Sequence, residues 1–272
     1  MARRKIGVDT WAFREMKLKD FVPSLGSLDF DCINLSSVSG ACSHVLPEHS
    51  THRLEMLKRI CESNGLPISA VQTGLTLASA DPDERDNAID LLRRYLEMCA
   101  ILATNTIIID LAGMREKDDV DKVVERTVPA LKQAGAIAAG QGVQLAIEAD
   151  SPAPINTVEV DRRLIEQVDC ANVGANYNAG NVAVSGHSPI EAIEALSGRI
   201  LNAQLKDVTA QDGRLACCPI GEGTMDFGAV MDKLEEAGYA GPVVVEYEGD
   251  ASPLAGIKTC LENLGSTISR PE

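Results

Sequence analysis

Two glutamates at the ends of short apolar runs are the strongest candidates for chemistry in this sequence. Glu148 ends the run LAIE at residues 145–148, and Glu246 ends the run VVVE at residues 243–246. A carboxylate that follows buried strand residues lies in a confined space, where its charge needs a partner. Two such groups can share a cation, or they can act as acid and base on opposite sides of a substrate. The alternative is a pair of structural carboxylates bonded to neighbouring loops.

Other polar or aromatic residues follow the remaining apolar runs. Lys206 is the last residue of one of them and could stabilise an oxyanion, or could pair with Asp207. Trp11, the only tryptophan, and Phe13 follow the first run; an indole there could stack on a substrate ring or pack as part of a lid. The other polar residues at these ends are Asp9, Asn34, Gln72, Thr73, Asp110, Asp150, Asn176, Asn178, Asn181, Gln204 and Glu248.

Eight apolar segments must position these side chains, and each is short enough to be a buried strand. Their apolar character is nearly continuous, as expected for strands that are covered on both faces. We predict strands at Ile6–Asp9, Cys32–Leu35, Ile68–Thr73, Thr106–Asp110, Val143–Glu148, Val173–Tyr177, Leu201–Lys206 and Val243–Tyr247.

The segments between these strands have helical periodicity with start and stop signals. We predict helices at Glu48–Ser63, Asp83–Leu102, Val120–Ala139, Thr157–Val168, Ser188–Leu196, Asp226–Ala237 and Ser252–Leu264. Pro129 is expected to kink the helix at Val120–Ala139 or to weaken its first half, because proline removes a backbone hydrogen bond.

The alternation of strands and helices predicts a parallel α/β sheet. In a chain of 272 residues, eight strands fit a closed (β/α)8 TIM barrel better than an open doubly wound sheet. A glycine-rich dinucleotide motif is missing after the first strand, which disfavours a Rossmann fold. We expect a single domain over residues 1–272. Barrels of this type carry their chemistry at the carboxyl ends of the strands, where the polar residues above stand.

The composition limits the partners and the location that we expect. The formal net charge is −15 and basic residues do not cluster, so nucleic acid is not an expected partner. No signal-peptide pattern is found, and no apolar run reaches the roughly 20 residues that span a membrane; we therefore expect a cytoplasmic protein without membrane contact. Eight cysteines without a CxxC pair predict free thiols, mostly buried. His44, His49 and His52 are expected to be solvated rather than metal ligands.

Five segments resemble the xylose isomerase-like barrel superfamily, especially its sugar phosphate isomerase/epimerase branch. They are GVQLAIE at 142–148, NVGANYN at 172–178, RILNAQLKD at 199–207, PIGEG at 219–223 and GYAGPVVVE at 238–246. The resemblance covers nearly the whole chain and is more specific for the fold than for the reaction. It implies a small, carbohydrate-like substrate. Barrels of this kind are often oligomeric, so a homo-oligomer is one possible state.

Members of this superfamily typically hold a divalent cation with a glutamate, an aspartate, a histidine and a second glutamate. Glu148 and Glu246 match the two glutamates, whereas Asn178 stands at the aspartate position and Gln204 at the histidine position. These four residues could bind Mg²⁺, Mn²⁺ or another divalent cation through oxygen atoms. The affinity should be reduced, because Asn178 lacks the negative charge of an aspartate and Gln204 offers an oxygen in place of a nitrogen. Without a cation, one glutamate should take up a proton, and Asn178 and Gln204 could bridge the pair as donors. Both alternatives stay open at this point.

The resemblance implies an isomerase, epimerase or dehydratase that acts on a small keto-sugar, polyol or related hydroxy-carbonyl compound. Glu148 and Glu246 would move a proton next to the carbonyl, while Lys206 or a cation would stabilise the oxyanion. Expected substrate contacts are Trp11, Phe13, Asp110, Asn181 and Asp207.

Three alternative functions remain. A metal-free lyase or hydrolase acting on a modified sugar would use the same two glutamates. A non-catalytic sugar-binding barrel with a degenerate metal site would explain the two carboxamides, although both glutamates are retained. The related abasic-site endonucleases use several metals, many histidines and a basic groove, and the four histidines and the acidic charge of this chain disfavour that function.

Overall fold

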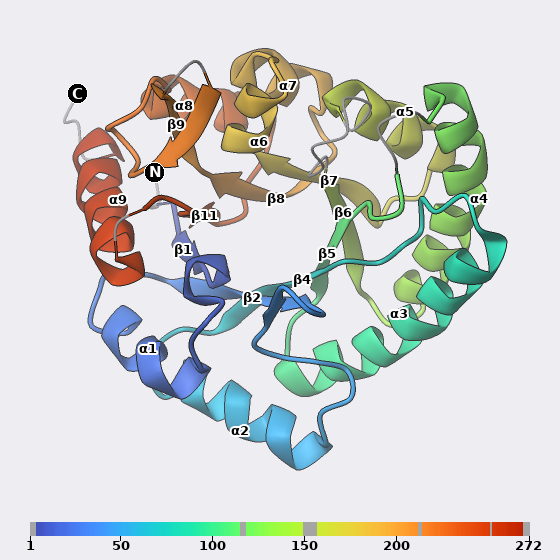
Figure 1. The fold of residues 1–272 in the computed structure, drawn as a ribbon, viewed down its shortest axis with the longest axis horizontal. Coiled ribbons are helices and arrows are strands. Elements are labelled where there is room, and N and C mark those ends of the chain that lie inside the picture. Colours follow the sequence, from blue (N-terminus) through green and yellow to red (C-terminus); the bar gives the residue numbers. More distant parts are fainter. Residues whose placement is uncertain (1–3, 115–117, 149–156, 212–213, 251, 269–272) are drawn as a thin grey trace.

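The computed structural model describes residues 4–114, 118–148, 157–211, 214–250 and 252–268. In this part of the chain, eight parallel strands form a barrel surrounded by helices (Figure 1). The strands are β1 (Ile6–Asp9), β2 (Cys32–Val38), β4 (Ile68–Thr73), β5 (Thr106–Asp110), β6 (Gln144–Glu148), β7 (Val173–Asn178), β8 (Ile200–Leu205) and β11 (Val243–Val245). β1 pairs with both β2 and β11, and this double pairing closes the sheet. The predicted (β/α)8 barrel is confirmed.

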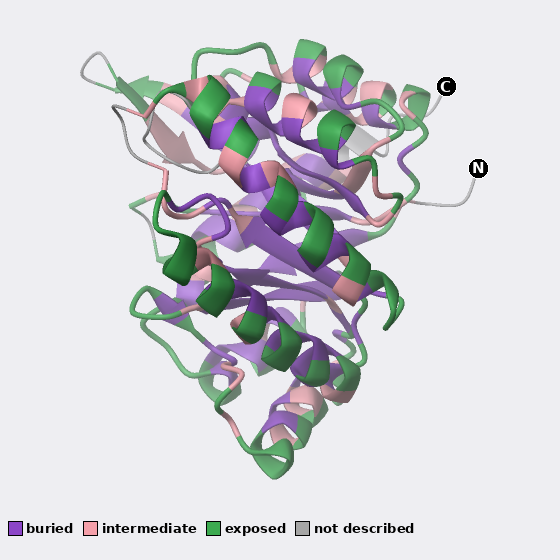
Figure 2. Cartoon of the chain, turned by 90° about the vertical axis from the view of Figure 1, so that its right-hand side faces the viewer, coloured by how far each residue is buried: buried purple, intermediate pink, exposed green. Residues whose placement is uncertain are grey.

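Seven helices lie where the periodicity predicts them, with small shifts at their ends. They are α2 (Thr51–Glu62), α3 (Pro82–Leu102), α4 (Val120–Ala139), α5 (Val158–Val168), α7 (Pro189–Ala195), α8 (Phe227–Glu236) and α9 (Pro253–Ile268). The outer helices bury one face against the strands and expose the other, as Figure 2 shows. Helices α1 (Leu18–Leu25) and α6 (Ala179–Val184) and the short 3₁₀ helix η1 (Trp11–Phe13) were not predicted from the sequence.

Helix α4 continues through Pro129 from its start at Val120. Val123 and Val124 are buried before the proline and Leu131 is buried after it. Because these contacts stabilise both halves of the helix, they offset the hydrogen bond that Pro129 removes. The expected weakness of the first half is therefore not seen in this structure.

The alternation of side chains along each strand decides which residues enter the barrel. On β6, Ile147 belongs to the apolar core between strands and helices, whereas Ala146 packs inside the barrel with Ala70 and Ile108. Since successive side chains of a strand point to opposite faces, Glu148 lies on the same side as Ala146. The carboxyl end of β6 thus directs a carboxylate to the mouth of the barrel, above an apolar layer.

Short strands outside the barrel extend two of its loops. β3 (Cys42–Ser43) pairs antiparallel with the end of β2. β9 (Asp207–Gln211) and β10 (Arg214–Cys218) form an antiparallel hairpin directly after β8. Neither was predicted. Because β8 ends at Leu205, a single residue, Lys206, separates the barrel strand from the hairpin.

Among the remaining expectations, His44 needs a correction because it is buried rather than solvated. Its Nε2 lies 3.1 Å from the carbonyl oxygen of Phe13, and its Nδ1 lies 3.4 Å from Sγ of Cys42. Burial lowers the pKa of His44, which favours the neutral ring. The eight cysteines are free thiols, as expected. In the described ranges, every helix is too short or too polar to cross a membrane.

Candidate active site

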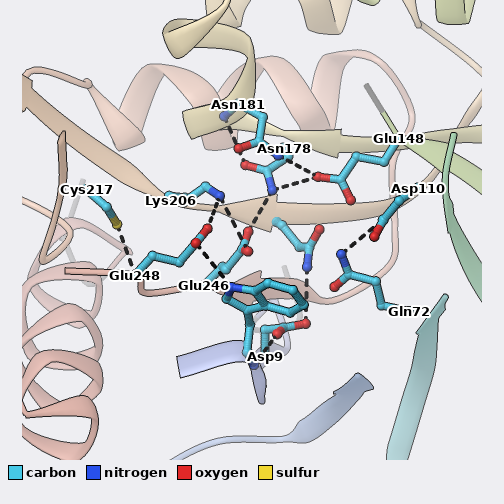
Figure 3. A network of polar contacts seen from close by, with 12 residues as sticks. Asp9, Gln72, Asp110, Glu148, Asn178, Asn181, Lys206, Cys217, Glu246 and Glu248 are labelled. Carbon is cyan, nitrogen blue, oxygen red and sulfur yellow. Dashed lines mark hydrogen bonds and ion pairs between the residues drawn. The ribbon is translucent and has the colours of Figure 1, made fainter. Parts of the chain in front are cut away.

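Glu148 and Glu246 converge on one side chain at the carboxyl ends of the barrel strands. Nδ2 of Asn178 donates to Oε1 of Glu148 at 2.9 Å and to Oε2 of Glu246 at 2.7 Å (Figure 3). Asn178 ends β7, Glu148 ends β6 and Glu246 directly follows β11. The three residues are at most 5% exposed. The two carboxylates therefore belong to one buried site, where charges interact more strongly than in water.

Three amide groups donate to Glu148. Asn176 donates to Oε2 at 2.7 Å, while Asn178 and Asn181 each donate to Oε1 at 2.9 Å. Asn176 and Asn178 lie two residues apart on β7, so their side chains share the inner face of the barrel. Asn181 lies in the first turn of α6, and its backbone N–H donates to Oδ1 of Asn178, which is the N-cap residue of that helix. This arrangement stabilises a charged carboxylate at Glu148.

Gln204 does not bridge the glutamates in the way that Asn178 does. Its Oε1 accepts from Nδ2 of Asn176 at 2.5 Å, and its Nε2 donates to Oδ2 of Asp9 at 3.2 Å. Asn176 in turn accepts from Nδ2 of Asn202 at 2.6 Å. A directed chain of amides therefore runs from Asn202 through Asn176 and Gln204 to Asp9.

Asp9 ends β1 and is completely buried. Burial raises the pKa of Asp9 to about 7, against the opposing effects of a hydrogen bond from the backbone N–H of Trp11 and the charge of Lys206. The Trp11 N–H donates to Oδ1 at 2.7 Å. Asp9 thus ties the loop after β1 to the amide chain of the site.

Lys206 lies against Glu246 and Glu248. Its Nζ lies 2.5 Å from Oε1 of Glu248 and 3.4 Å from Oε1 of Glu246, and its side chain is 7% exposed (Figure 3). Glu248 also accepts from Nε1 of Trp11 at 3.1 Å. Burial raises the pKa of Glu248, but the charge of Lys206 and the hydrogen bonds to Glu248 outweigh it and hold that pKa below its usual value. Glu248 and Lys206 therefore form an ion pair, called the charged pair below.

Asp207, an expected substrate contact, is bonded to backbone N–H groups of nearby loops. Its carboxylate accepts the backbone N–H groups of Val208, Gly221 and Gly223 at 2.8, 2.9 and 3.0 Å. A Cβ atom at Gly223 would lie 2.1 Å from Oδ1 of Asp207, so only glycine allows this approach. Asp207 supports the tight turn at 221–223, and we leave it out of the proposed substrate contacts.

The other expected contacts lie around the network. Trp11, Asp110 and Asn181 are half-buried. Oδ1 of Asp110 accepts from Nε2 of Gln72 at 3.0 Å. The ring of Phe13 stacks on Phe21 with ring centres 4.3 Å apart, which makes Phe13 a packing residue. Asp150 lies outside the described residues.

A cleft of about 210 Å³ opens beside the charged pair. Phe13, Arg14, Tyr247 and Glu248 contribute to its lining. The cleft is thus adjacent to the carboxylate that binds Lys206, and Phe13 borders it although its ring is packed.

The four positions that the resemblance assigns to a metal do not offer four ligands to one point. Asn178 turns its NH₂ group to both glutamates, and the oxygen of Gln204 is engaged by Asn176. Over the ranges that the structure describes, there is no cluster of three or more His, Cys, Asp or Glu side chains that could hold a metal ion. This donor set does not fit a divalent cation, and we assign no step to one.

Sequence and structure comparisons place the chain among known proteins. The profile of the xylose isomerase-like TIM barrel family matches residues 25–266. An inosose dehydratase of Geobacillus thermodenitrificans is 26% identical over 275 residues, which cover 88% of this chain and 92% of that protein. The solved structure of the IolI protein with a bound zinc atom has a TM-score of 0.82 at 19% identity, and covers 97% of this chain and 98% of its own.

A second solved structure, 3-keto-D-glucoside 4-epimerase from E. coli in its apo form, has a TM-score of 0.77 at 18% identity. It covers 98% of this chain and 100% of its own. At these identities the two structural likenesses concern the fold. The family profile, which spans most of the barrel, shows that this chain belongs to the xylose isomerase-like TIM barrel family.

Proposed function

We propose that the protein is an enzyme of the isomerase, epimerase or dehydratase type that removes a proton next to the carbonyl of a small polyhydroxylated ketone. The observation that carries this proposal is the pair Glu148 and Glu246, joined by the single amide of Asn178 inside the barrel mouth. The similarity to an inosose dehydratase and the fold shared with a 3-keto-D-glucoside 4-epimerase support it, since both of those substrates are polyhydroxylated ketones.

The proposed reaction needs one base, one acid and one positive group. One glutamate, in its ionised form, takes the proton from the carbon next to the carbonyl, and the C–H electrons form an enediolate. Lys206 stabilises the negative oxygen. The other glutamate, in its protonated form, gives a proton back. A proton returned to the other face of the same carbon completes epimerisation. A proton returned to the former carbonyl carbon completes isomerisation, when the neighbouring oxygen gives its proton to the former carbonyl oxygen. A proton given to a hydroxyl group on the next carbon releases water and completes dehydration.

Asn178 positions the acid and the base in this scheme. Its NH₂ group has two hydrogens, and each glutamate accepts one of them. Because one planar group bonds both carboxylates, their separation is fixed before the substrate binds, which favours catalysis. Trp11, Asp110 and Asn181 are more exposed than the glutamates and are the proposed contacts for substrate hydroxyl groups.

Solvent deuterium exchange tests the proposal, because proton removal next to the carbonyl is common to all three reactions. The full chain is incubated in D₂O with keto-inositols and ketohexoses, and ¹H NMR follows the signal next to the carbonyl. We expect exchange with at least one compound, and Glu148→Gln and Glu246→Gln should each lower its rate by at least about 100-fold. Glu235→Gln, an exposed position on α8, is the matched control and should leave the rate unchanged.

Two outcomes would contradict the proposal. One is the absence of exchange with every compound of the panel. The other is exchange that survives in both glutamine variants at the wild-type rate.

A metal-free lyase acting on a modified keto-sugar is the second candidate. The observation that favours it is the ammonium of Lys206 beside Glu246, which supplies a positive charge without a metal ion. The same proton removal would then expel a larger leaving group than hydroxide. The NMR experiment distinguishes the two candidates, because a lyase would release that group and a dehydratase would release water.

A further inference from the structure

The amide of Asn178 has one orientation, and the backbone sets it. Oδ1 of Asn178 accepts the N–H of Asn181 at 3.2 Å. A backbone N–H group can only donate, so the oxygen must face it and Nδ2 must face Glu148 and Glu246. Rotating the amide to offer its oxygen to a metal ion would place an NH₂ group against that N–H and remove the N-cap of α6. Asn178 is therefore a donor to the two carboxylates and is not a metal ligand.

The oxygen of Gln204 is engaged in a similar way. Nδ2 of Asn176 donates to Oε2 of Glu148 at 2.7 Å, which fixes the nitrogen side of the Asn176 amide. The same nitrogen donates to Oε1 of Gln204, whose Nε2 is thereby directed to Asp9. Rotating the Gln204 amide would bring two NH₂ groups together in a fully buried place. Both carboxamides at the expected ligand positions thus keep their oxygens in internal hydrogen bonds.

The aliphatic part of the Lys206 side chain is confined by the backbone of α6, which restricts where the ammonium can lie. A Cβ atom at Gly180 would lie 2.6 Å from Cγ and 2.8 Å from Cβ of Lys206, so the backbone of α6 packs directly on the lysine. With the stem confined, Nζ stays near Glu246 and Glu248. A divalent ion between Glu148 and Glu246 would bring a second cation close to this ammonium, and the two would repel each other.

We infer that Lys206 is the resident cation of this site and that the protein neither binds nor uses a divalent metal there. Asn178 holds the two carboxylates together by hydrogen bonds. In typical members of the family that the sequence resembles, a metal ion would hold them by coordination. The ammonium of Lys206 provides the positive charge for the oxyanion, and this catalytic part rests on the proposed function. Ion binding is measured without substrate, so failure of the inference can be told apart from failure of the proposed reaction.

Calorimetric titration of the full chain tests the inference. The protein, purified without a metal-affinity tag, is dialysed against EDTA and then titrated with ZnCl₂, MnCl₂ and MgCl₂, and elemental analysis is done before dialysis. We expect no saturable binding at this site and far less than one metal ion per chain. The double variant Asn178→Asp/Gln204→His supplies the two missing ligand types and should bind one zinc or manganese ion at least about 100-fold more tightly than the wild type.

A matched control separates the site from the surface. Asn105→Asp/Gln141→His makes the same two changes at exposed positions and should leave ion binding as weak as in the wild type. The double variant Asn178→Asp/Gln204→His is called the ligand-restored variant. Adding Glu246→Gln to it should abolish its gain in metal affinity. Equal binding by the surface variant and the ligand-restored variant would contradict the inference.

The role of Lys206 is tested in the same titrations. Lys206→Met in the ligand-restored variant should tighten metal binding further because it removes a repelling charge, whereas Lys206→Arg should not. Should the double variant fail to fold, as judged by circular dichroism, the wild type and Lys206→Met alone decide the question. The inference is overturned by one EDTA-removable metal ion per wild-type chain that is lost in Glu246→Gln. Its lysine part is overturned by identical metal affinities with and without Lys206.

Discussion

The indole of Trp11 and the carboxylate of Glu248 connect the loop after the first barrel strand with the loop after the last. Nε1 of Trp11 donates to Oε2 of Glu248 at 3.1 Å, while Oε1 of the same carboxylate binds Lys206. The chain has one tryptophan, so all indole fluorescence of the protein comes from Trp11.

We expect a polyhydroxylated ketone that enters the site to change the emission of Trp11, because the half-buried indole borders the charged pair. A fluorescence titration measures this change, and Glu248→Gln should shift the emission of the free protein by removing a charge beside the ring. A ligand whose binding is detected by calorimetry but leaves the emission unaltered would place its site away from Trp11.

Gly180→Ala should disturb Lys206 more than it disturbs the fold. The added methyl group would lie 2.6 Å from Cγ of Lys206 and 2.9 Å from its carbonyl oxygen. We expect a loss of about 1–3 kcal/mol in the free energy of unfolding, together with a deuterium-exchange rate at least about 10-fold lower.

Gly265→Ala, in α9, is the matched control, because a Cβ atom there meets open space. It should be neutral or stabilise by up to about 1 kcal/mol, since alanine favours helix. Urea unfolding and the exchange assay compare the two variants. Equal effects of the two substitutions would show that the contact with Lys206 does not matter.

The raised pKa of Asp9 predicts a particular pH dependence of stability. Burial raises this pKa from 3.8 to about 7. The folded protein then keeps a proton that the unfolded chain has already lost, so the contribution of Asp9 to stability falls as the pH rises from about 4 to about 7 and stays low above that. The shift bounds this loss at about 4 kcal/mol.

Urea unfolding of the wild type and of Asp9→Asn at several pH values measures this effect. The stability difference between the two should move in favour of Asp9→Asn as the pH rises from 5 to 8, and then stop changing. Asp90→Asn, at an exposed position of α3, should show no such trend. A difference between wild type and Asp9→Asn that is constant with pH would refute the prediction.

Asp207→Ala should destabilise the protein, because Asp207 has a structural role and is not a proposed substrate contact. Its carboxylate is the acceptor for three backbone N–H groups, and the substitution leaves them without it. We expect a loss of about 2–4 kcal/mol in the free energy of unfolding. Glu222→Gln, an exposed change in the same loop, should stay within about 0.5 kcal/mol of the wild type. Thermal and urea unfolding give both values; similar stabilities for the two variants would remove the structural role given to Asp207.

The barrel was predictable because its strands are buried on both faces, which makes most of them apolar along nearly their whole length. β4 and β5 match the prediction to the residue. Among the missed elements, α6 has six residues, too few for helical periodicity to appear. Helix α1 did have a signal, because Leu18, Phe21, Val22 and Leu25 stand at helical spacing and are buried. The hairpin β9–β10 had a usable signal, since Asp212-Gly213 stands between its strands and this dipeptide favours tight hairpin turns.

Most members of the candidate site could be named from the sequence, including the amides of Asn178, Asn181 and Gln204, but their hydrogen-bond partners could not. The spacing of Glu148 and Glu246 after apolar runs was enough to single them out. Strand alternation could also have selected Asn202, which lies two residues before Gln204 on β8. The direction in which each amide faces could not be predicted, because it depends on partners distant in sequence. For Asn176 these partners are Glu148, Gln204 and Asn202.

The hairpin β9–β10 touches both members of the charged pair. It begins at Asp207, directly after Lys206, and Sγ of Cys217, on β10, accepts the backbone N–H of Glu248 at 3.2 Å. Tilting this small antiparallel unit would rotate the peptide units next to the ammonium and pull on the loop that carries its counter-ion. The positions of the ammonium and of its counter-ion therefore depend on an element that lies outside the barrel sheet.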